Sequence, residues 1–79
     1  MQKADYRSIT GLQLYRLAKG VSMQVVGKAT HIPAAEVSYL EAGRLIPSTI
    51  QKERLSAYFG VSIDTLMKRF DLDELLQGK

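Results

Sequence analysis

The sequence has no cysteine and only one histidine. Without cysteine the chain can form no disulfide, no thiolate metal site and no thiol nucleophile. It also lacks an apolar run approaching the roughly 20 residues that a membrane-spanning helix needs. The opening ten residues, MQKADYRSIT, do not have the apolar stretch of a signal peptide. We therefore expect a cytoplasmic protein with no membrane segment.

Residues that carry catalysis are equally scarce. The chain has no Gly-rich phosphate loop, and its carboxylates form no pair set apart from charges with a structural explanation. His31 has no acidic or sulfur partner at ligand spacing, which favours a turn residue over a metal ligand or a base. The sequence thus predicts no enzymatic activity, no cofactor and no metal.

The composition is that of one small folded domain. The chain has 79 residues, 46% hydrophobic and 24% charged, so it has enough apolar surface to offset the entropy of ordering. Its charge is uneven: residues 1–70 carry ten Lys/Arg against five Asp/Glu, whereas residues 71–79 carry three acidic residues and one Lys. A basic body is compatible with a polyanionic partner. A solvated surface of uneven charge is the alternative, and charge alone favours it.

Capping residues and glycines divide the chain into helices. Thr10 with Gln13, and Ser48 with Gln51, are spaced as capping boxes, and Pro33 suits the first position of a helix. The predicted starts and stops, in chain order, are Thr10 and Gly20, Ser22, Pro33 and Gly43, Ser48 and Gly60, and Ser62. Asp71 and Glu74 predict a short sixth helix that ends at Gly78. No strand pattern of useful length is present, so we expect an all-α, compact five-helix bundle, or six helices with the last one.

Apolar spacing predicts which side of each helix faces the core. Val25, Val26 and Ala29 share one face of the second helix, with Ile32 closing over it. The third helix is expected to turn Val37 and Leu40 inward, and the fourth Leu55, Tyr58 and Phe59. These residues form the predicted core.

The segment LYRLAKGVSMQVVGKATHIPAAEVSYLEAGRLIPS, followed by LSAYFGVSIDTLM, resembles the Cro/CI-type helix-turn-helix family, which has the lambda-repressor-like fold of phage repressors. The resemblance covers about residues 9–67. Its anchors are Arg16, Lys19 to Ser22, Val26, Ile32, Val37 and Ser38, Glu41 with Gly43, Pro47, and Gly60 to Ser62. It implies a DNA-binding domain over residues 1–70, whose second helix crosses the DNA backbone and whose third enters the major groove. Residues 71–79 then form a short acidic amphipathic extension.

The chain departs from the family pattern at four positions. Gly27 stands where the family usually has a small residue such as Ala, and His31 where it usually has Gly in the turn. Histidine tolerates the left-handed region better than most residues, so the turn can form at modest cost. Met23 stands where Gln commonly grips a phosphate, and Lys52 where a Leu is often buried.

The third helix carries the residues that the resemblance places against bases: Ala34, Ala35, Glu36, Ser38 and Tyr39. Alanine methyls can pack on thymine methyls, and a glutamate can accept from a cytosine amino group. Glu36 also brings negative charge toward phosphates, which lowers nonspecific affinity and penalises wrong bases. Alternatively, Ala34, Ala35 and Glu36 merely favour a helix start, and both explanations can hold together.

Phosphate contacts are expected mainly from the second helix and from the loop after the third. The candidates are Arg16, Ser22, Met23 through its backbone N–H, Gln24, Lys28 and Arg44. Arg16 and Glu41 match a partly buried ion pair of the family that joins the first and third helices, so Arg16 has a structural role as well. Solvated charge is the alternative for Lys28 and Arg44.

The C-terminal part of the chain holds more apolar residues than one five-helix core needs. Dimer-interface candidates are Leu66, Met67, Phe70, Leu72, Leu75 and Leu76. A homodimer would place two third helices about one DNA turn apart on a pseudo-palindrome. A C-terminal turn folded back on its own monomer is the alternative.

Two functions remain open from sequence. The leading one is a sequence-specific transcriptional regulator of bacterial or phage type, most simply a repressor, that binds double-stranded DNA. The other is a protein-interaction module on the same fold, an antitoxin or phage-encoded modulator, with weak or secondary DNA binding. The Ala-Ala-Glu start of the third helix and the apolar, acidic tail favour a protein partner, whereas the motif set and the basic body favour DNA.

Overall fold

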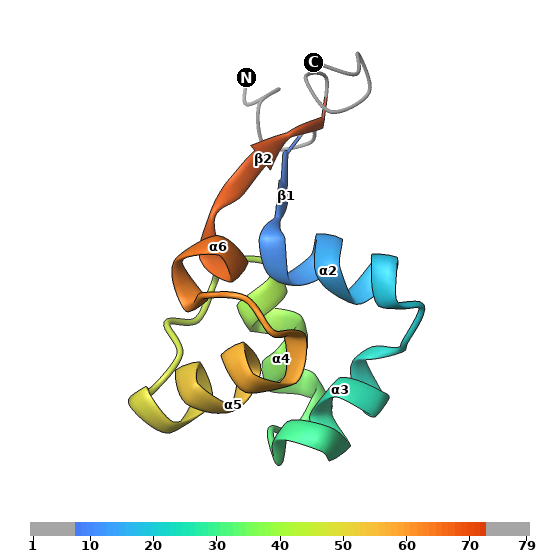
Figure 1. Ribbon diagram of the computed structural model, residues 1–79, viewed down its shortest axis with the longest axis vertical. Coiled ribbons are helices and arrows are strands. Elements are labelled where there is room, and N and C mark those ends of the chain that lie inside the picture. Colours follow the sequence, from blue (N-terminus) through green and yellow to red (C-terminus); the bar gives the residue numbers. More distant parts are fainter. Residues whose placement is uncertain (1–7, 73–79) are drawn as a thin grey trace.

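The computed structural model describes residues 8–72, which form five helices and a two-stranded sheet (Figure 1). The helices pack around one core, and the sheet projects from one end of the bundle, beside α2 and α6 (Figure 1). In chain order the elements are β1 (Ser8–Thr10), α2 (Gly11–Lys19), α3 (Met23–Thr30), α4 (Ala34–Glu41), α5 (Thr49–Phe59), α6 (Ile63–Met67) and β2 (Arg69–Asp71).

The predicted caps of four helices are confirmed. The side chains of Thr10, Ser22, Ser48 and Ser62 each accept a hydrogen bond from the backbone N–H three residues later, at 3.1 to 3.3 Å. The box at Ser48 is reciprocal, because the Gln51 side chain accepts from the Ser48 N–H at 3.0 Å. At Thr10 the predicted box forms only in part: its hydroxyl caps α2, but within the described residues the Gln13 side chain does not accept from the Thr10 N–H. These bonds satisfy first-turn amides that have no partner within the helix.

Both ends of α4 are sharply defined. Pro33 is the N-cap, one residue before its predicted place in the first turn, and its carbonyl accepts from the N–H groups of Glu36 and Val37. At the other end Gly43 has φ of 75°, and the N–H of Arg44 donates to the Tyr39 carbonyl at 2.9 Å. This is a Schellman turn, in which a left-handed residue after the helix lets the chain reverse.

The expectation of an all-α fold was wrong at the sheet. Strands β1 and β2 pair antiparallel, with Ile9 opposite Phe70 and Thr10 opposite Arg69. Each strand has only three residues, too few for an alternating pattern to show. The two strands lie at opposite ends of the described chain, so no local sequence pattern could predict that they pair.

The core is made by apolar residues from all five helices and the α3–α4 turn: Leu12, Val26, Ile32, Val37, Leu40, Leu55 and Leu66. The predicted face of α3 was wrong in two places, because Val25 and Ala29 are exposed. Val26 is buried together with Thr30, one turn further on, whose hydroxyl donates to the Val26 carbonyl at 2.7 Å. A hydroxyl satisfied in this way can occupy a core position. Lys52, which takes the place of a family leucine, is exposed on α5.

One predicted dimer residue belongs to the monomer core instead. Leu66 is completely buried, because α6 packs on both α2 and α5. Met67, Phe70 and Leu72 remain partly exposed. Leu75, Leu76 and all but the first two residues of the acidic extension lie outside the described residues, as does the predicted sixth helix beyond Leu72.

The turn between α3 and α4 depends on two unusual backbone positions. His31 is the one non-glycine residue with positive φ in the described chain, at 60°, as its place in the turn predicts. At Gly27, a Cβ atom would lie 2.5 Å from the Ile32 carbonyl oxygen. Glycine therefore permits a closer approach of helix and turn than alanine would allow.

A charged pair fixes α4 to α2. The Arg16 guanidinium donates to both carboxylate oxygens of Glu41, through Nε to Oε2 and through Nη2 to Oε1 at 3.3 Å. Its Nη1 donates to the Val21 carbonyl at 3.0 Å. The exposed fraction of the side chain is 11% for Arg16 and 3% for Glu41. Such a two-pronged contact fixes direction as well as distance.

We expect the Arg16→Met substitution to lower the free energy of unfolding by about 3 to 5 kcal/mol, because it leaves a buried carboxylate without its partner. The double variant Arg16→Met/Glu41→Leu should recover most of that loss, since it removes both charges together. Urea unfolding of the two variants and the native chain measures both values. A single variant that loses less than about 1 kcal/mol would show the pair to be no stronger than a surface pair.

Candidate nucleic-acid interface

Helix α4 presents an exposed face on the side opposite its core contacts. Val37, Leu40 and Glu41 are buried, whereas Ala35 and Ala42 are exposed and Tyr39 keeps 52% of its surface in solvent. Side chains three and four residues apart share a helix face, so Ala35, Tyr39 and Ala42 form one stripe. We call this stripe, with Ala34 and Ser38 at its half-buried edge, the outer face of α4.

Glu36 lies at the edge of the outer face, on the side toward α5. Its Oε1 accepts a hydrogen bond from Nε2 of Gln51 on α5 at 2.9 Å, and its side chain is half-buried. The same Gln51 side chain accepts from the Ser48 N–H, so the Glu36 carboxylate is tied to the start of α5. Its second oxygen remains available to a donor. Glu36 therefore lies beside the outer face with its orientation already set.

The phosphate candidates divide into two groups at opposite ends of α4. Gln24 and Lys28 are exposed and line a shallow depression with His31 and Ala34, where the α3–α4 turn leads into α4. Arg44 is exposed in the loop after α4. A ligand lying along α4 would meet cationic or polar side chains at both of its ends.

Three other phosphate candidates, Arg16, Ser22 and Met23, have structural roles. The Ser22 hydroxyl caps α3, and the Met23 side chain packs against the core, which leaves its backbone N–H for a ligand. The Arg16 guanidinium is largely occupied by Glu41 and the Val21 carbonyl. For a phosphate, Met23 therefore offers only its backbone N–H. Arg16 offers only the guanidinium N–H groups that do not bind Glu41 or Val21.

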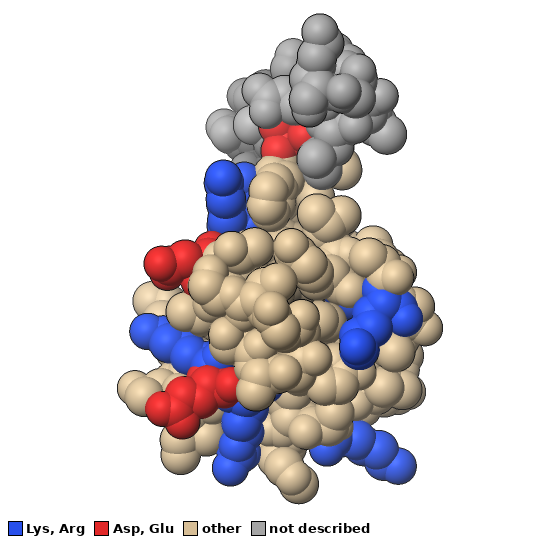
Figure 2. All heavy atoms as spheres, viewed as in Figure 1, with Lys and Arg blue, Asp and Glu red and all other residues tan. Residues whose placement is uncertain are grey.

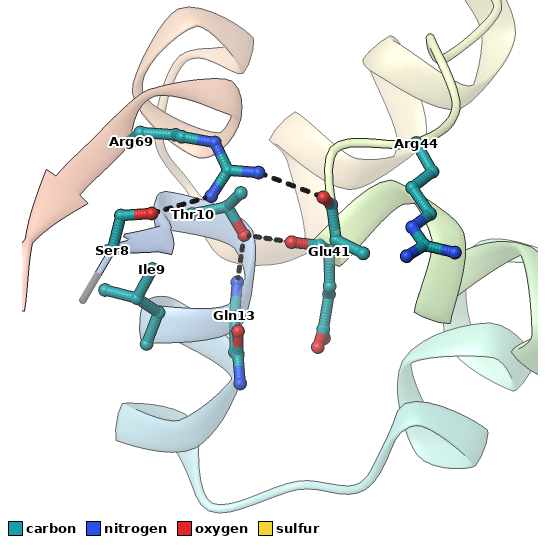
Figure 3. A pocket seen from close by; sticks show the side chains of 8 residues that line it. Ser8, Ile9, Thr10, Gln13, Glu41, Arg44 and Arg69 are labelled. Carbon is teal, nitrogen blue, oxygen red and sulfur yellow. Dashed lines mark hydrogen bonds between the residues drawn. The ribbon is translucent and has the colours of Figure 1, made fainter. Parts of the chain in front are cut away.

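The C-terminal end of α4 is held by two further contacts from distant parts of the chain (Figure 3). The Thr10 hydroxyl donates to the Glu41 carbonyl at 2.8 Å. The Arg69 guanidinium donates to the Ala42 carbonyl and to the Ser8 hydroxyl, both at 3.0 Å. A helix end leaves carbonyls without intrahelical partners, and these side chains supply donors.

Sequence reasoning missed the roles of Gln51, Arg54 and Arg69. Gln51 was assigned to a capping box alone, although it also orients Glu36. Arg54 on α5 donates to the Thr30 carbonyl at the end of α3, at 3.5 Å. Arg69 contacts a residue 61 positions away in the chain. None of these contacts has a local pattern that could have indicated it.

Basic side chains spread over the visible face of the molecule and outnumber acidic ones there (Figure 2). Within residues 8–72, no three His, Asp or Glu side chains come together in a way that could hold a metal ion. No helix in the same range is long and apolar enough to cross a membrane. The buried polar side-chain atoms of this range all have hydrogen-bond partners.

Comparison with known families agrees with this geometry. No curated protein and no solved structure is significantly similar to the chain. A family model described as a helix-turn-helix domain matches residues 11–70, which include α2 through α6 and the start of β2. The chain belongs to the helix-turn-helix domain family.

Proposed function

We propose that this protein is a sequence-specific DNA-binding transcriptional regulator, acting as a repressor of the Cro/CI type, with α4 in the major groove. The observation that supports this most is the outer face of α4. It is exposed, hydrogen bonds from Thr10 and Arg69 hold the C-terminal end of its helix, and candidate phosphate contacts flank it. Helix-turn-helix domains bind DNA with this arrangement of a reading helix between backbone contacts.

Base recognition in this proposal depends on methyl groups and a few polar atoms. Ala34 and Ala35 offer methyls to thymine, and Tyr39 and Ser38 offer hydroxyls. Glu36 offers one carboxylate oxygen at the edge of the outer face, where it accepts from a cytosine amino group and repels other acceptors. With no Arg, Asn or Gln on α4, recognition also depends on DNA shape and backbone geometry.

Backbone contacts come from both sides of α4. On one side are the first-turn N–H groups of Met23 and Gln24, which point outward from the start of α3, and the side chains of Gln24 and Lys28. On the other side is Arg44, with its exposed guanidinium. These groups supply affinity that does not depend on sequence.

We further propose that two copies bind a pseudo-palindromic site through an apolar groove between the α4–α5 loop and α6. Ile46 is 87% exposed there, and Leu45, Pro47, Ile63 and Met67 line the groove with it, while the charged residues Lys52, Asp64 and Arg69 also line it. An isoleucine so exposed beside an apolar depression is typical of an interface. The loop follows α4 directly, so a twofold contact there brings two α4 helices close enough to read one site. Of the sequence-predicted interface residues that the structure describes, Met67 is the one that lines this groove.

Selection of bound sequences from a random DNA pool tests the function itself. We expect one enriched pseudo-palindrome, bound by anisotropy titration at least about 1000-fold more tightly than scrambled DNA. Affinity for it should fall steeply with salt, with a log–log slope of about −0.9 for each phosphate contacted. Failure to enrich any sequence, with affinity indifferent to salt, would reject a DNA-binding regulator.

We expect Glu36→Gln to tighten binding to random DNA while relaxing the preference for the selected site, because it removes a negative charge that penalises wrong bases. A change of roughly tenfold in the specificity ratio corresponds to one lost discriminating contact. Glu53→Gln is the matched control, since it removes the same charge from an exposed position on α5. If the two variants behave equally, Glu36 has no role in base recognition and only favours the start of α4.

Ile46→Glu should shift the protein to monomer, because it places a charge in the apolar groove of each copy. Sedimentation velocity would show the smaller species, and affinity for the full site should fall by at least about tenfold while a half-site is bound as before. Leu17→Glu is the control, since Leu17 is also an exposed apolar residue, at 54%, but lies on α2. A dimer that survives Ile46→Glu would contradict this interface.

A further inference from the structure

A polar pocket lies between β1, the start of α2 and the end of α4 (Figure 3). It has a volume of about 390 Å³ and is open to solvent. Arg44 and Arg69 line it from the α4–α5 loop and from β2, together with Ser8 and Gln13. We propose that this pocket binds a backbone phosphate of the DNA, with Arg69 and Arg44 as its two cations. This inference rests on the proposed DNA-binding function.

Arg69 is already oriented toward such a ligand. Nη1 donates to the Ser8 hydroxyl and Nη2 to the Ala42 carbonyl, so the guanidinium is held in one plane at the end of α4. Each of these nitrogens carries a second N–H, and Nε carries another. A guanidinium fixed by two neutral acceptors keeps its full charge and loses little further side-chain entropy when it binds an oxyanion.

Two other groups of the pocket have free donors. Within the described part of the chain, neither the Arg44 guanidinium nor the Gln13 side-chain amide makes a hydrogen bond, although both line the pocket. In contrast to Arg16, Arg44 has no ion pair with a carboxylate of residues 8–72. Charged and amide N–H donors that line one pocket from separate elements can each bind a phosphate oxygen.

The acidic residue of the pocket does not oppose an anion. The Glu41 carboxylate is paired with Arg16, and the Glu41 carbonyl accepts from Thr10. The two remaining charged side chains of the pocket are therefore the arginines, and their sum is +2. A phosphodiester carries one negative charge, so two cationic side chains at the rim of the pocket attract it without an opposing carboxylate.

The position of the pocket favours a phosphodiester over a free anion. Ala42 lines the pocket and also ends the outer face of α4. A DNA strand that passes the C-terminal end of α4 therefore reaches the pocket while α4 occupies the groove. The contact extends the DNA footprint toward the β1–β2 ribbon.

Salt titration of DNA binding by Arg69→Gln and Arg44→Gln tests the site. Each variant should weaken binding by roughly five- to tenfold, equally for selected and random DNA, and lower the magnitude of the salt slope by about 1. Lys68→Gln is the matched control: it removes the same charge from the neighbouring residue, whose Nζ lies over the Phe70 ring at 5.4 Å, outside the pocket. It should leave the slope nearly unchanged.

The Arg69→Lys variant distinguishes the effect of the Arg69 charge on DNA binding from the effect of its hydrogen bonds on stability. Lysine cannot bridge Ser8 and Ala42 as the guanidinium does, so thermal stability should fall as in Arg69→Gln, yet the salt slope should stay native because the charge remains. A slope lost equally in both variants would show a structural role only and would overturn the inference.

Ethylation interference on the selected site is a second test. In the native protein, ethylation of one backbone phosphate should weaken binding, and this effect should disappear in both Arg69→Gln and Arg44→Gln. In parallel, ¹⁵N spectra recorded with inorganic phosphate alone test for a free anion: saturation of the pocket near 1 mM without any effect on DNA affinity would overturn the assignment to the DNA backbone. If native protein selects no DNA, the proposed function fails; if it does and Arg69→Gln matches Lys68→Gln, only this site fails.

Discussion

The contact between Arg16 and Glu41 is the constraint on which the position of α4 depends. Glu41 is held through its carboxylate by α2 and through its carbonyl by Thr10, just before α2. The next carbonyl, that of Ala42, accepts from Arg69 on β2. Three side chains from two ends of the chain thus fix the last turn of α4. At the other end the close approach at Gly27 and the left-handed His31 fix its entry. The outer face can therefore stay free of contacts without losing its direction.

Features that depend on neighbours in sequence were predictable. A cap involves residues three positions apart, so Thr10, Ser22, Ser48 and Ser62 each announced a helix that the structure contains. The helix-turn-helix pattern and the place of His31 in its turn were likewise predictable.

Features that depend on contacts between the two ends of the described chain were not predictable from sequence. The pairing of Ile9 with Phe70, and the Arg69 contacts with Ser8 and Ala42, have no local pattern. Leu66 looked like spare apolar surface because sequence alone does not show that α6 packs on α2.

The division of charge around α4 separates affinity from recognition. Helix α4 itself carries two glutamates and no basic residue. Glu41 is neutralised by Arg16, and Glu36 is anchored by Gln51 at the edge of the outer face. Attraction to a polyanion must then come from outside the helix, from Lys28 and the start of α3 on one side and from Arg44 and Arg69 on the other. In the proposed complex, a substitution on the outer face would change which sequence is preferred, whereas a substitution at its flanks would change affinity for every sequence.

The double use of Arg69 has a thermodynamic consequence. Its guanidinium joins the β1–β2 ribbon to the end of α4, and in the proposed pocket it also contacts a phosphate. Pairing of β1 with β2 brings Arg69 into position, so a chain with the ribbon formed binds the phosphate better than a chain with the ribbon open. Linkage requires the reverse as well: bound DNA stabilises the ribbon by the same free energy. If the proposed pocket binds DNA, anything that binds or displaces β2 would change DNA affinity without touching α4, because the cation at the end of α4 belongs to the strand.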